Sequence, residues 1–328
     1  MSAEGPAVAW PAPGWLGSEQ AALRAAWTAQ RMPHALLIHE APGAGGAWLA
    51  LWAARLVLCE HPQRAPCGEC RACRRVLARG HPDLSFLGLE EDSRQIRIEQ
   101  VRELSAELAL TAHGGGYKVA IVSPADAMNR FAANALLKTL EEPSARTLLI
   151  LVVTQPSRLP ATVLSRCQRL RVRAPERAQS LAWLAAARGP GDWGQALDIL
   201  GEAPLLLAAA SDPSELAAIG AEVHQGLEAL CGGGGDLVAT AERWARGEVD
   251  LRLRCIENWL TDRIRRGERE GLFMTEVRAA PYLSGGGPVL NIRELFGLLD
   301  EARDLRATLD VPLNRGLALE ALLRRLVP

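Results

Sequence analysis

The first half of the chain alternates short apolar runs with amphipathic stretches, and this alternation constrains the fold more than any other feature. Apolar runs without polar alternation, such as Leu148–Thr154, are typical of strands that are covered on both faces. The strand candidates are Ala35–His39, Asp83–Leu87, Lys118–Val122, Leu148–Thr154 and Leu170–Arg173. The helix candidates are Ser18–Arg31, Trp48–Leu58, Ile98–Thr111 and Arg130–Glu142. Strands and helices in alternation predict a parallel sheet with helices on its faces.

The strand pattern stops after Ala174-Pro175, and the rest of the chain has helical patterns. The clearest of these are Glu176–Arg188, Trp193–Leu200, Leu295–Leu305 and Asn314–Leu326. A turn signal at Ser211-Asp212-Pro213 and glycine loops at Gly232–Gly235 and Gly285–Gly287 separate them. We therefore expect an α/β domain over residues 1–174, a small helical domain over 175–212 and an all-α domain over 213–328.

The composition indicates a soluble protein of the cytoplasm. The segment from Met1 to Trp15 has no basic region followed by a long apolar run, so we expect no secretion signal. No apolar run approaches the ~18 residues that a membrane helix needs. The formal net charge of −1 gives no support for a polyanion-binding surface over the whole molecule, although a local basic patch stays open.

Four of the seven cysteines lie close together in the sequence, at the spacing C-x7-C-x2-C-x2-C. In a cytosolic protein such crowding favours a metal site over disulfides, because two CxxC steps and one preceding cysteine can converge on one ion. Zn²⁺ is the predicted metal, and four thiolates would leave it no open position, so its role would be structural. An iron–sulfur cluster and a set of free thiols are the alternatives. The four cysteines are Cys59, Cys67, Cys70 and Cys73, and the neighbouring Arg71, Arg74 and Arg75 would offset part of their charge.

A glycine turn, EAPGAGGAWL, joins the first strand candidate to the helix that follows. Strand, glycine turn and helix form the geometry that holds a phosphate on backbone N–H groups. The P-loop pattern G-x-x-x-x-G-K-[ST], aligned on Gly45, puts Glu40 at the first glycine, Gly46 at the lysine and Ala47 at the hydroxyl. The turn at Gly43, Gly45 and Gly46 is therefore present without the groups that handle phosphate and Mg²⁺. We expect no functional ATP site, although the backbone N–H groups could still bind an anion weakly.

A second expected feature of P-loop ATPases is also missing. Their second key strand ends in acidic residues that hold Mg²⁺ and orient water. Here the strand Val119–Val122 is followed by Ser123-Pro124, without a carboxylate at either position. Asp126 lies further on, at the start of a helical pattern, where we expect it to cap the helix.

Two later motifs connect the chain to a known family. The segments AANALLKTLEEP and LPATVLSRC resemble the clamp-loader branch of the AAA+ family, and the resemblance covers about Met32 to Val172. Within that branch the chain is most similar to members with a degenerate P-loop and a cysteine cluster. The resemblance implies a P-loop-type (AAA+) α/β domain with an inserted zinc module at 59–73, a small helical lid domain and an all-α C-terminal collar that serves oligomerisation.

The resemblance also implies roles for single residues. Ser165-Arg166-Cys167 matches the SRC motif, whose arginine reaches the γ-phosphate in a neighbouring ATPase subunit. A guanidinium suits that role because it is always charged and can stabilise charge on the transferred phosphoryl group.

Thr154 lies at or next to the sensor-1 position, and Pro204 lies where active members carry the sensor-2 arginine. Lys138 with Glu141 and Glu142 forms helical pairs that need no further role.

The implied function is that of a non-hydrolysing subunit in the clamp loader of a replicative DNA polymerase. Its partners would be ATPase clamp-loader subunits and a delta subunit, with the sliding clamp and primed DNA reached through the hetero-oligomer. Two alternatives stay open at this point. The chain could be a divergent active NTPase, or a zinc-dependent nucleic-acid-binding module built around Cys59–Cys73.

Overall fold

The computed structural model describes residues 10–90, 93, 95–209, 213–269, 292–309 and 314–327. The chain divides into two compact units, Met1–Gly189 with Glu202–Ala209, and Pro190–Gly201 with Ala210–Pro328. The predicted glycine loop at Gly285–Gly287 and the first two residues of the predicted turn at Ser211-Asp212-Pro213 lie outside the described residues.

The first unit contains a five-stranded parallel sheet with the order β2-β3-β4-β1-β5. All seven residues of β4 are buried, which explains the apolar run of the six residues that follow Thr147. The strands are β1 (Ala35–Glu40), β2 (Leu84–Leu87), β3 (Lys118–Val122), β4 (Thr147–Val153) and β5 (Gln168–Val172). The predicted α/β class with a parallel sheet is confirmed.

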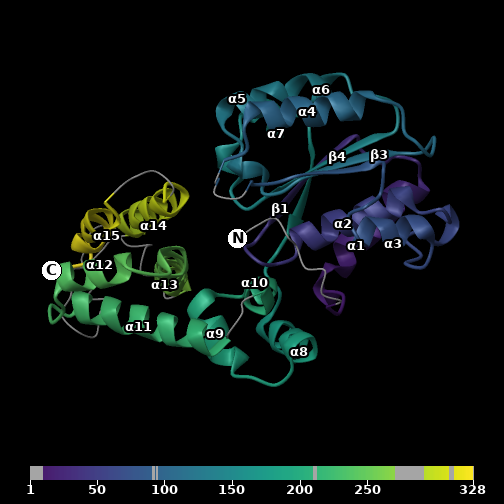
Figure 1. Cartoon of the computed structure of the whole chain (residues 1–328). Helices are drawn as coiled ribbons and strands as arrows, with labels where there is room; N and C mark the ends of the chain where they lie inside the picture. Colours follow the sequence, from purple (N-terminus) through teal and green to yellow (C-terminus); the bar gives the residue numbers. More distant parts are fainter. Residues whose placement is uncertain are drawn as a thin grey trace. The chain divides into compact units, whose positions relative to one another are not determined.

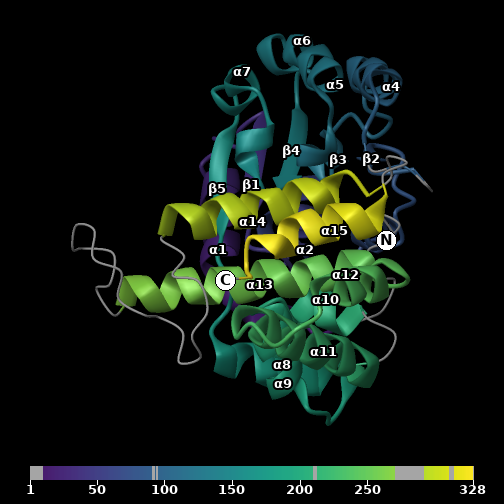
Figure 2. The ribbon, with the colours of Figure 1, turned by 90° about the vertical axis from the view of Figure 1, so that its left-hand side faces the viewer.

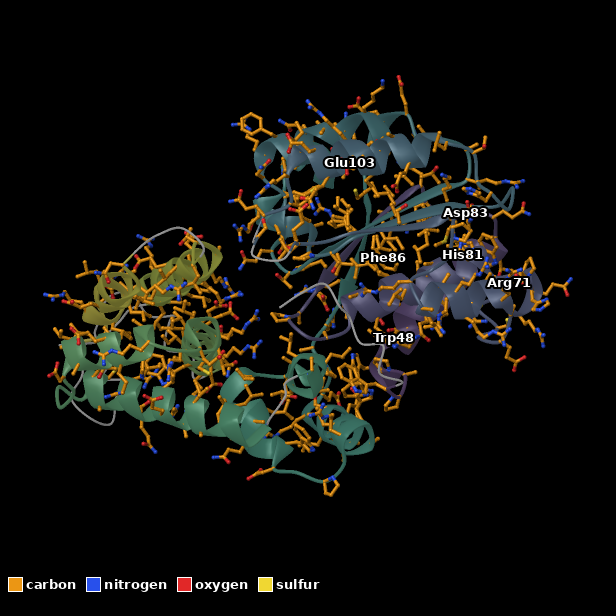
Figure 3. All side chains as sticks on the ribbon, in the orientation of Figure 1. Trp48, Arg71, His81, Asp83, Phe86 and Glu103 are labelled. Carbon is orange, nitrogen blue, oxygen red and sulfur yellow. The ribbon has the colours of Figure 1, made fainter. Side chains whose placement is uncertain are left out.

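Helices cover both faces of this sheet (Figure 1). Because side chains alternate along a strand, Ile38 and Ile150 pack on one face, while Leu37 and Leu149 pack on the other. The first face carries α1 (Gly17–Thr28), α2 (Gly46–Leu58) and α3 (Arg71–Leu77). The second face carries α4 (Ile98–Ala109), α5 (Arg130–Ala135), α6 (Leu137–Glu141) and α7 (Ala161–Leu164). Arg71 on α3 and Glu103 on α4 mark the two sides in Figure 3.

Two element boundaries differ from the prediction. The helix expected over Arg130–Glu142 is divided at Leu136, although this residue keeps right-handed helical dihedral angles and donates its N–H to Ala132 O. Strand β5 begins at Gln168, before the apolar residues, because Gln168 pairs with Leu36 at the sheet edge. Polar side chains are common on edge strands, so a search for apolar runs does not detect the first residues of β5.

The region 175–212 contributes helices to both units. Helices α8 (Arg177–Arg188) and α10 (Pro204–Ala209) pack together in the first unit, while α9 (Trp193–Leu200) belongs to the second. Trp183 of α8 makes edge contacts with Trp10 and Trp15 and donates its indole N–H to Pro11 O at 2.8 Å. The division into three domains stays a prediction.

The second unit is helical around a core that includes the fully buried Trp244. Its further helices are α11 (Pro213–Cys231), α12 (Leu237–Ala245), α13 (Val249–Arg269), α14 (Ile292–Ala307) and α15 (Arg315–Arg324). Helix α14 packs along α13, and α15 packs along α12 (Figure 2). Among the described helices, none combines the length and apolar character that crossing a bilayer requires.

The packing of α11 on α9 leaves no room for a side chain at Gly220. A Cβ there would lie 1.8 Å from Ile199 Cγ2. We expect Gly220→Ala to lower the free energy of unfolding of the second unit by about 1–3 kcal/mol through overpacking, measured by urea denaturation. Gly17→Ala in α1 is the control, because a Cβ at Gly17 meets nothing within 4 Å. An equal loss in both variants would contradict this account of the α9–α11 contact.

Candidate functional site

The four clustered cysteines converge in the first unit. The Sγ atoms of Cys59 and Cys70 are 4.0 Å apart, as are those of Cys67 and Cys73, and all four lie within 4.8 Å of one another. Cys59 follows the last residue of α2, and Cys70 is the N-cap of α3. The predicted set of four residues is thus brought together at a distance suited to one metal ion.

Backbone N–H groups point at three of the sulfur atoms. Cys70 N donates to Cys67 Sγ at 3.4 Å, Cys73 N donates to Cys70 Sγ at 3.3 Å and His61 N donates to Cys59 Sγ at 3.4 Å. Such bonds stabilise thiolates, which are the form that binds metal. The cluster is also tied to α1, because Arg24 donates to Ala65 O at 2.9 Å.

Burial and hydrogen bonding act in opposite directions on these thiols. The N–H of Cys70 lowers the pKa of Cys67 to about 6, while burial raises the pKa of Cys59 and raises that of Cys73 to about 12. Sequence reasoning missed one cation that interacts with the cluster. Burial lowers the pKa of Arg55 on α2, and the charge of Cys73 acts against this.

The glycine turn between β1 and α2 holds a carboxylate of its own chain. Glu40 Oε2 accepts the N–H of Gly45 at 3.0 Å and that of Gly46 at 2.6 Å. Gly43 and Gly45 adopt positive φ values of 68° and 104°, which favour glycine and turn the backbone around the carboxylate. In the alignment to the P-loop pattern, Glu40 only replaces the first glycine. In the structure, its carboxylate accepts hydrogen bonds from the N–H groups that would face a phosphate in a P-loop.

The position that corresponds to the P-loop lysine has no space for a side chain. A Cβ on Gly46 would lie 2.8 Å from Glu40 Cδ and 3.0 Å from Val152 Cγ1. With Glu40 in its present conformation, a side chain at this position would have to displace the Glu40 carboxylate and shift the side chain of Val152. The carboxylate of Glu40 therefore occupies the space that a side chain at residue 46 would need.

Neighbouring segments of the first unit also contact the turn. Leu205 of α10 donates its N–H to Gly43 O at 3.2 Å, and Trp15 donates its indole N–H to Ala44 O at 2.8 Å. A Cβ on Gly43 would lie 2.9 Å from Leu206 Cγ. Helix α10 begins at Pro204, the residue aligned with the sensor-2 arginine, so its first turn packs directly on the glycine turn.

The prediction that Asp126 caps a helix is wrong. Asn129 caps α5 by accepting the N–H of Ala132, whereas Asp126 Oδ2 accepts the N–H and Oγ1–H of Thr154 and the N–H of Gln155. Asp126 is only 7% exposed, and its Oδ1 has no hydrogen-bond partner among the described residues. Thr154 thus holds a buried carboxylate at the end of β4, and its sensor-1 role stays a prediction.

Arg166 lies between α7 and β5, with a side chain that is 36% exposed. Its Nη2 is 2.7 Å from Glu141 Oε1, and its Nη1 donates to Thr162 O at 2.9 Å. The next residue, Cys167, is buried in the core, and burial raises the pKa of its thiol to about 11. The guanidinium is therefore carried on a fixed backbone and held by an exposed ion pair, which is worth about 0–1 kcal/mol.

The structure thus forms two groups of functional candidates in the first unit. One is the cysteine cluster at the ends of α2 and α3. The other lies at the carboxyl ends of β1, β3 and β4, where Glu40 and Asp126 are close enough for their charges to interact. Sequence reasoning named Glu40 and Glu141 but missed their contacts with the glycine turn and with Arg166, and it did not single out Arg55. The acidic residue directly before the glycine turn was the one available signal.

Comparison with known proteins gives matches in the same region. The family model described as "DNA polymerase III, delta subunit" matches residues 18–176. DNA polymerase III subunit delta' of Pseudomonas aeruginosa is 48% identical over 169 residues, which are 51% of this chain and 51% of the relative. The delta' subunit of Escherichia coli (strain K12) is 37% identical over 218 residues, which are 66% of this chain and 64% of the relative.

More distant matches name other subunits of the same polymerase. DNA polymerase III subunit tau of Bacillus subtilis is 33% identical over 141 residues, which are 43% of this chain and 24% of that relative. The chain spans between 42% and 64% of the length of the curated delta' relatives it matches.

The ionisation of Glu40 predicts a pH dependence of stability. Burial raises its pKa from 4.5 to about 7, against the lowering effect of the Gly46 and Gly45 N–H groups. The folded chain therefore holds a proton more tightly than the unfolded chain. This contribution is fully present below pH ~4.5 and is lost as the pH rises through ~7, with a total on the order of 3 kcal/mol.

We expect urea denaturation between pH 4.5 and 8 to show this loss of unfolding free energy in the wild type and not in Glu40→Gln. Glu142→Gln at an exposed residue is the control and should keep the wild-type dependence. If Glu40→Gln keeps the same slope with pH, the titrating group is not Glu40.

Proposed function

Since the chain belongs, over residues 18–176, to the delta-prime family of DNA polymerase III subunits, we propose that it is a clamp-loader subunit that does not hydrolyse ATP. It donates Arg166 to the active site of a neighbouring ATPase subunit. One observation carries the non-hydrolysing part of this proposal. The carboxylate of Glu40 accepts the Gly45 and Gly46 N–H groups, where an ATPase needs a phosphate and a lysine.

The surroundings of Arg166 support a role in trans. The guanidinium is partly exposed, and within the described part of the chain its partners are the exposed carboxylate of Glu141, the Thr162 carbonyl and the Ser165 hydroxyl. Glu141 is itself 51% exposed, so a phosphate on a neighbouring subunit can compete with it for the guanidinium. The buried Cys167 anchors the backbone next to Arg166, which keeps the finger in place.

Zn²⁺ is the metal that best fits the cysteine cluster. At a Zn–S distance of 2.3 Å, the sulfur atoms of a tetrahedral site lie about 3.8 Å apart. The two 4.0 Å separations and the N–H groups directed at the sulfur atoms agree with such a site. Cys59, Cys67, Cys70 and Cys73 would hold the ion, which would fix the end of α2 to the start of α3. A bound cation would also offset the cost of burying thiolates.

The partners follow from the family and from the relatives' names. We propose assembly with ATPase subunits of the tau/gamma type and with a delta subunit, in a hetero-oligomer that opens a sliding clamp and places it on primed DNA. The helical residues 213–328 serve as the oligomerisation collar, and residues 175–212 as the lid. Neither alternative function, the active NTPase or the nucleic-acid-binding zinc module, gains support from a specific contact.

The arginine proposal is tested by the ATPase activity of the assembled clamp loader. We expect Arg166→Ala to lower the DNA-stimulated ATPase rate of the partner subunit by about tenfold or more, because a finger stabilises charge in the transition state. Arg166→Lys should recover only part of the rate. Arg169→Ala, at an exposed position on β5, is the matched control and should leave the rate unchanged.

Size-exclusion chromatography must show that each variant still assembles. Glu141→Gln should leave the partner's rate unchanged or raise it, with Glu142→Gln as the adjacent control. An Arg166→Ala complex with full activity would refute the finger, and ATP hydrolysis by the wild-type chain alone would refute the non-hydrolysing proposal.

The zinc proposal is tested by metal content. We expect one Zn²⁺ per purified chain by elemental analysis, loss of most zinc in Cys73→Ser, and a lower melting temperature after treatment with a chelator. Cys255→Ala is the control, because this buried cysteine belongs to the second unit and is not one of the four clustered cysteines. Iron in place of zinc, or full zinc content in Cys73→Ser, would overturn the assignment.

A further inference from the structure

The glycine turn keeps the shape of an anion site although its chain supplies the anion. Two N–H groups at the start of the 13-residue helix α2 meet on the same oxygen, Glu40 Oε2. The backbone around them has the left-handed glycine conformations that such a turn requires. A carboxylate oxygen that accepts two backbone N–H groups stands in for a phosphate oxygen, both chemically and in charge.

We propose that Glu40 is a built-in ligand of the turn at residues 40–47, that it closes the turn to external phosphate, and that replacing this one residue by glycine opens a site for inorganic phosphate. The proposal rests on the non-hydrolysing function proposed above and supplies its physical cause. The absence of the P-loop lysine would only weaken phosphate binding by the backbone N–H groups. The present proposal is that Glu40 blocks these N–H groups.

Steric and electrostatic effects both exclude a second anion. The Gly46 nitrogen is only 2.6 Å from Glu40 Oε2, so an incoming phosphate oxygen could reach its N–H only by displacing the carboxylate. Asp126 adds a further negative charge close to Glu40. At the other side of the turn, Leu205 and Leu206 of α10 and the side chain of Leu16 occupy the space next to Gly43 and Gly45.

The same contacts explain why the turn needs no ligand to keep its conformation. Glu40 connects the end of β1 to the start of α2, while α10 and Trp15 hold the carbonyl groups of Gly43 and Ala44. Removing the Glu40 side chain leaves these outer contacts in place. The two N–H groups would then be free in a turn that is still held from outside, which is the arrangement that binds phosphate.

The experiment compares phosphate binding by the full-length wild type, Glu40→Gly and Glu40→Gln, with Glu142→Gln as the control. Inorganic phosphate is titrated by calorimetry, and the amide resonances of Gly45 and Gly46 are followed by NMR. We expect Glu40→Gly to bind phosphate at least about tenfold more tightly than the wild type, because two charge-assisted hydrogen bonds become available. Glu40→Gln keeps an oxygen on the N–H groups and should show no such gain.

Equal phosphate binding at these amides in the wild type and in Glu40→Gly, or none in a folded Glu40→Gly, overturns the proposal.

If Glu40→Gly does not fold, the pH titration of the Gly45 and Gly46 amide resonances decides. They should shift with the ionisation of Glu40 in the wild type and not in Glu40→Gln, and an unchanged titration in Glu40→Gln would refute the contact. These readouts use this chain alone, so they can fail while the Arg166 test succeeds. ATP hydrolysis by the chain would refute both.

Discussion

The complete burial of β4 is the constraint on which the first unit depends. A strand with all seven residues buried needs helices on both faces and a paired strand on each edge, here β1 and β3. Parallel pairing then brings the carboxyl ends of β1, β3 and β4 to the same edge of the sheet. Ligands of such sheets bind at this edge. In this chain the edge carries Glu40, Asp126 and Thr154, whose polar groups are partly satisfied by one another and by nearby backbone.

In an ATPase the glycine turn has both the phosphate-binding conformation and N–H groups that are free to bind phosphate. In this chain the turn has that conformation, which contacts within the protein maintain, but its N–H groups are already hydrogen-bonded. A phosphate-binding turn has N–H groups that attract charge from outside, whereas here Glu40 brings the charge from the preceding strand. The cost is a carboxylate in a largely buried place next to a second one, which is why its pKa rises to about 7. Arg166 takes no part in this arrangement, and its side chain is 36% exposed.

Sequence patterns predicted what depends on local periodicity and spacing. The strands at β1, β3 and β4, the fold class and the convergence of four cysteines all follow from runs, alternation and CxxC steps. Contacts between distant residues were beyond this reasoning. Asp126 bonds to Thr154, 28 positions away, and Glu141 pairs with Arg166, 25 positions away. The sequence alignment showed that Glu40 replaces a glycine of the P-loop pattern. It could not show that the Glu40 side chain folds back and accepts hydrogen bonds from the Gly45 and Gly46 N–H groups.

The indole of Trp15 gives the closed turn a practical property. Its N–H bonds to Ala44 O, inside the turn, and its ring meets Trp183 of α8 at a centroid distance of 5.7 Å. Indole fluorescence responds to hydrogen bonding and to neighbouring rings, so light emission from this side chain depends on the state of the turn. Although the chain has nine tryptophans, a difference spectrum against Trp15→Phe isolates this one. The protein therefore carries an optical reporter inside the glycine turn between β1 and α2, without any added label.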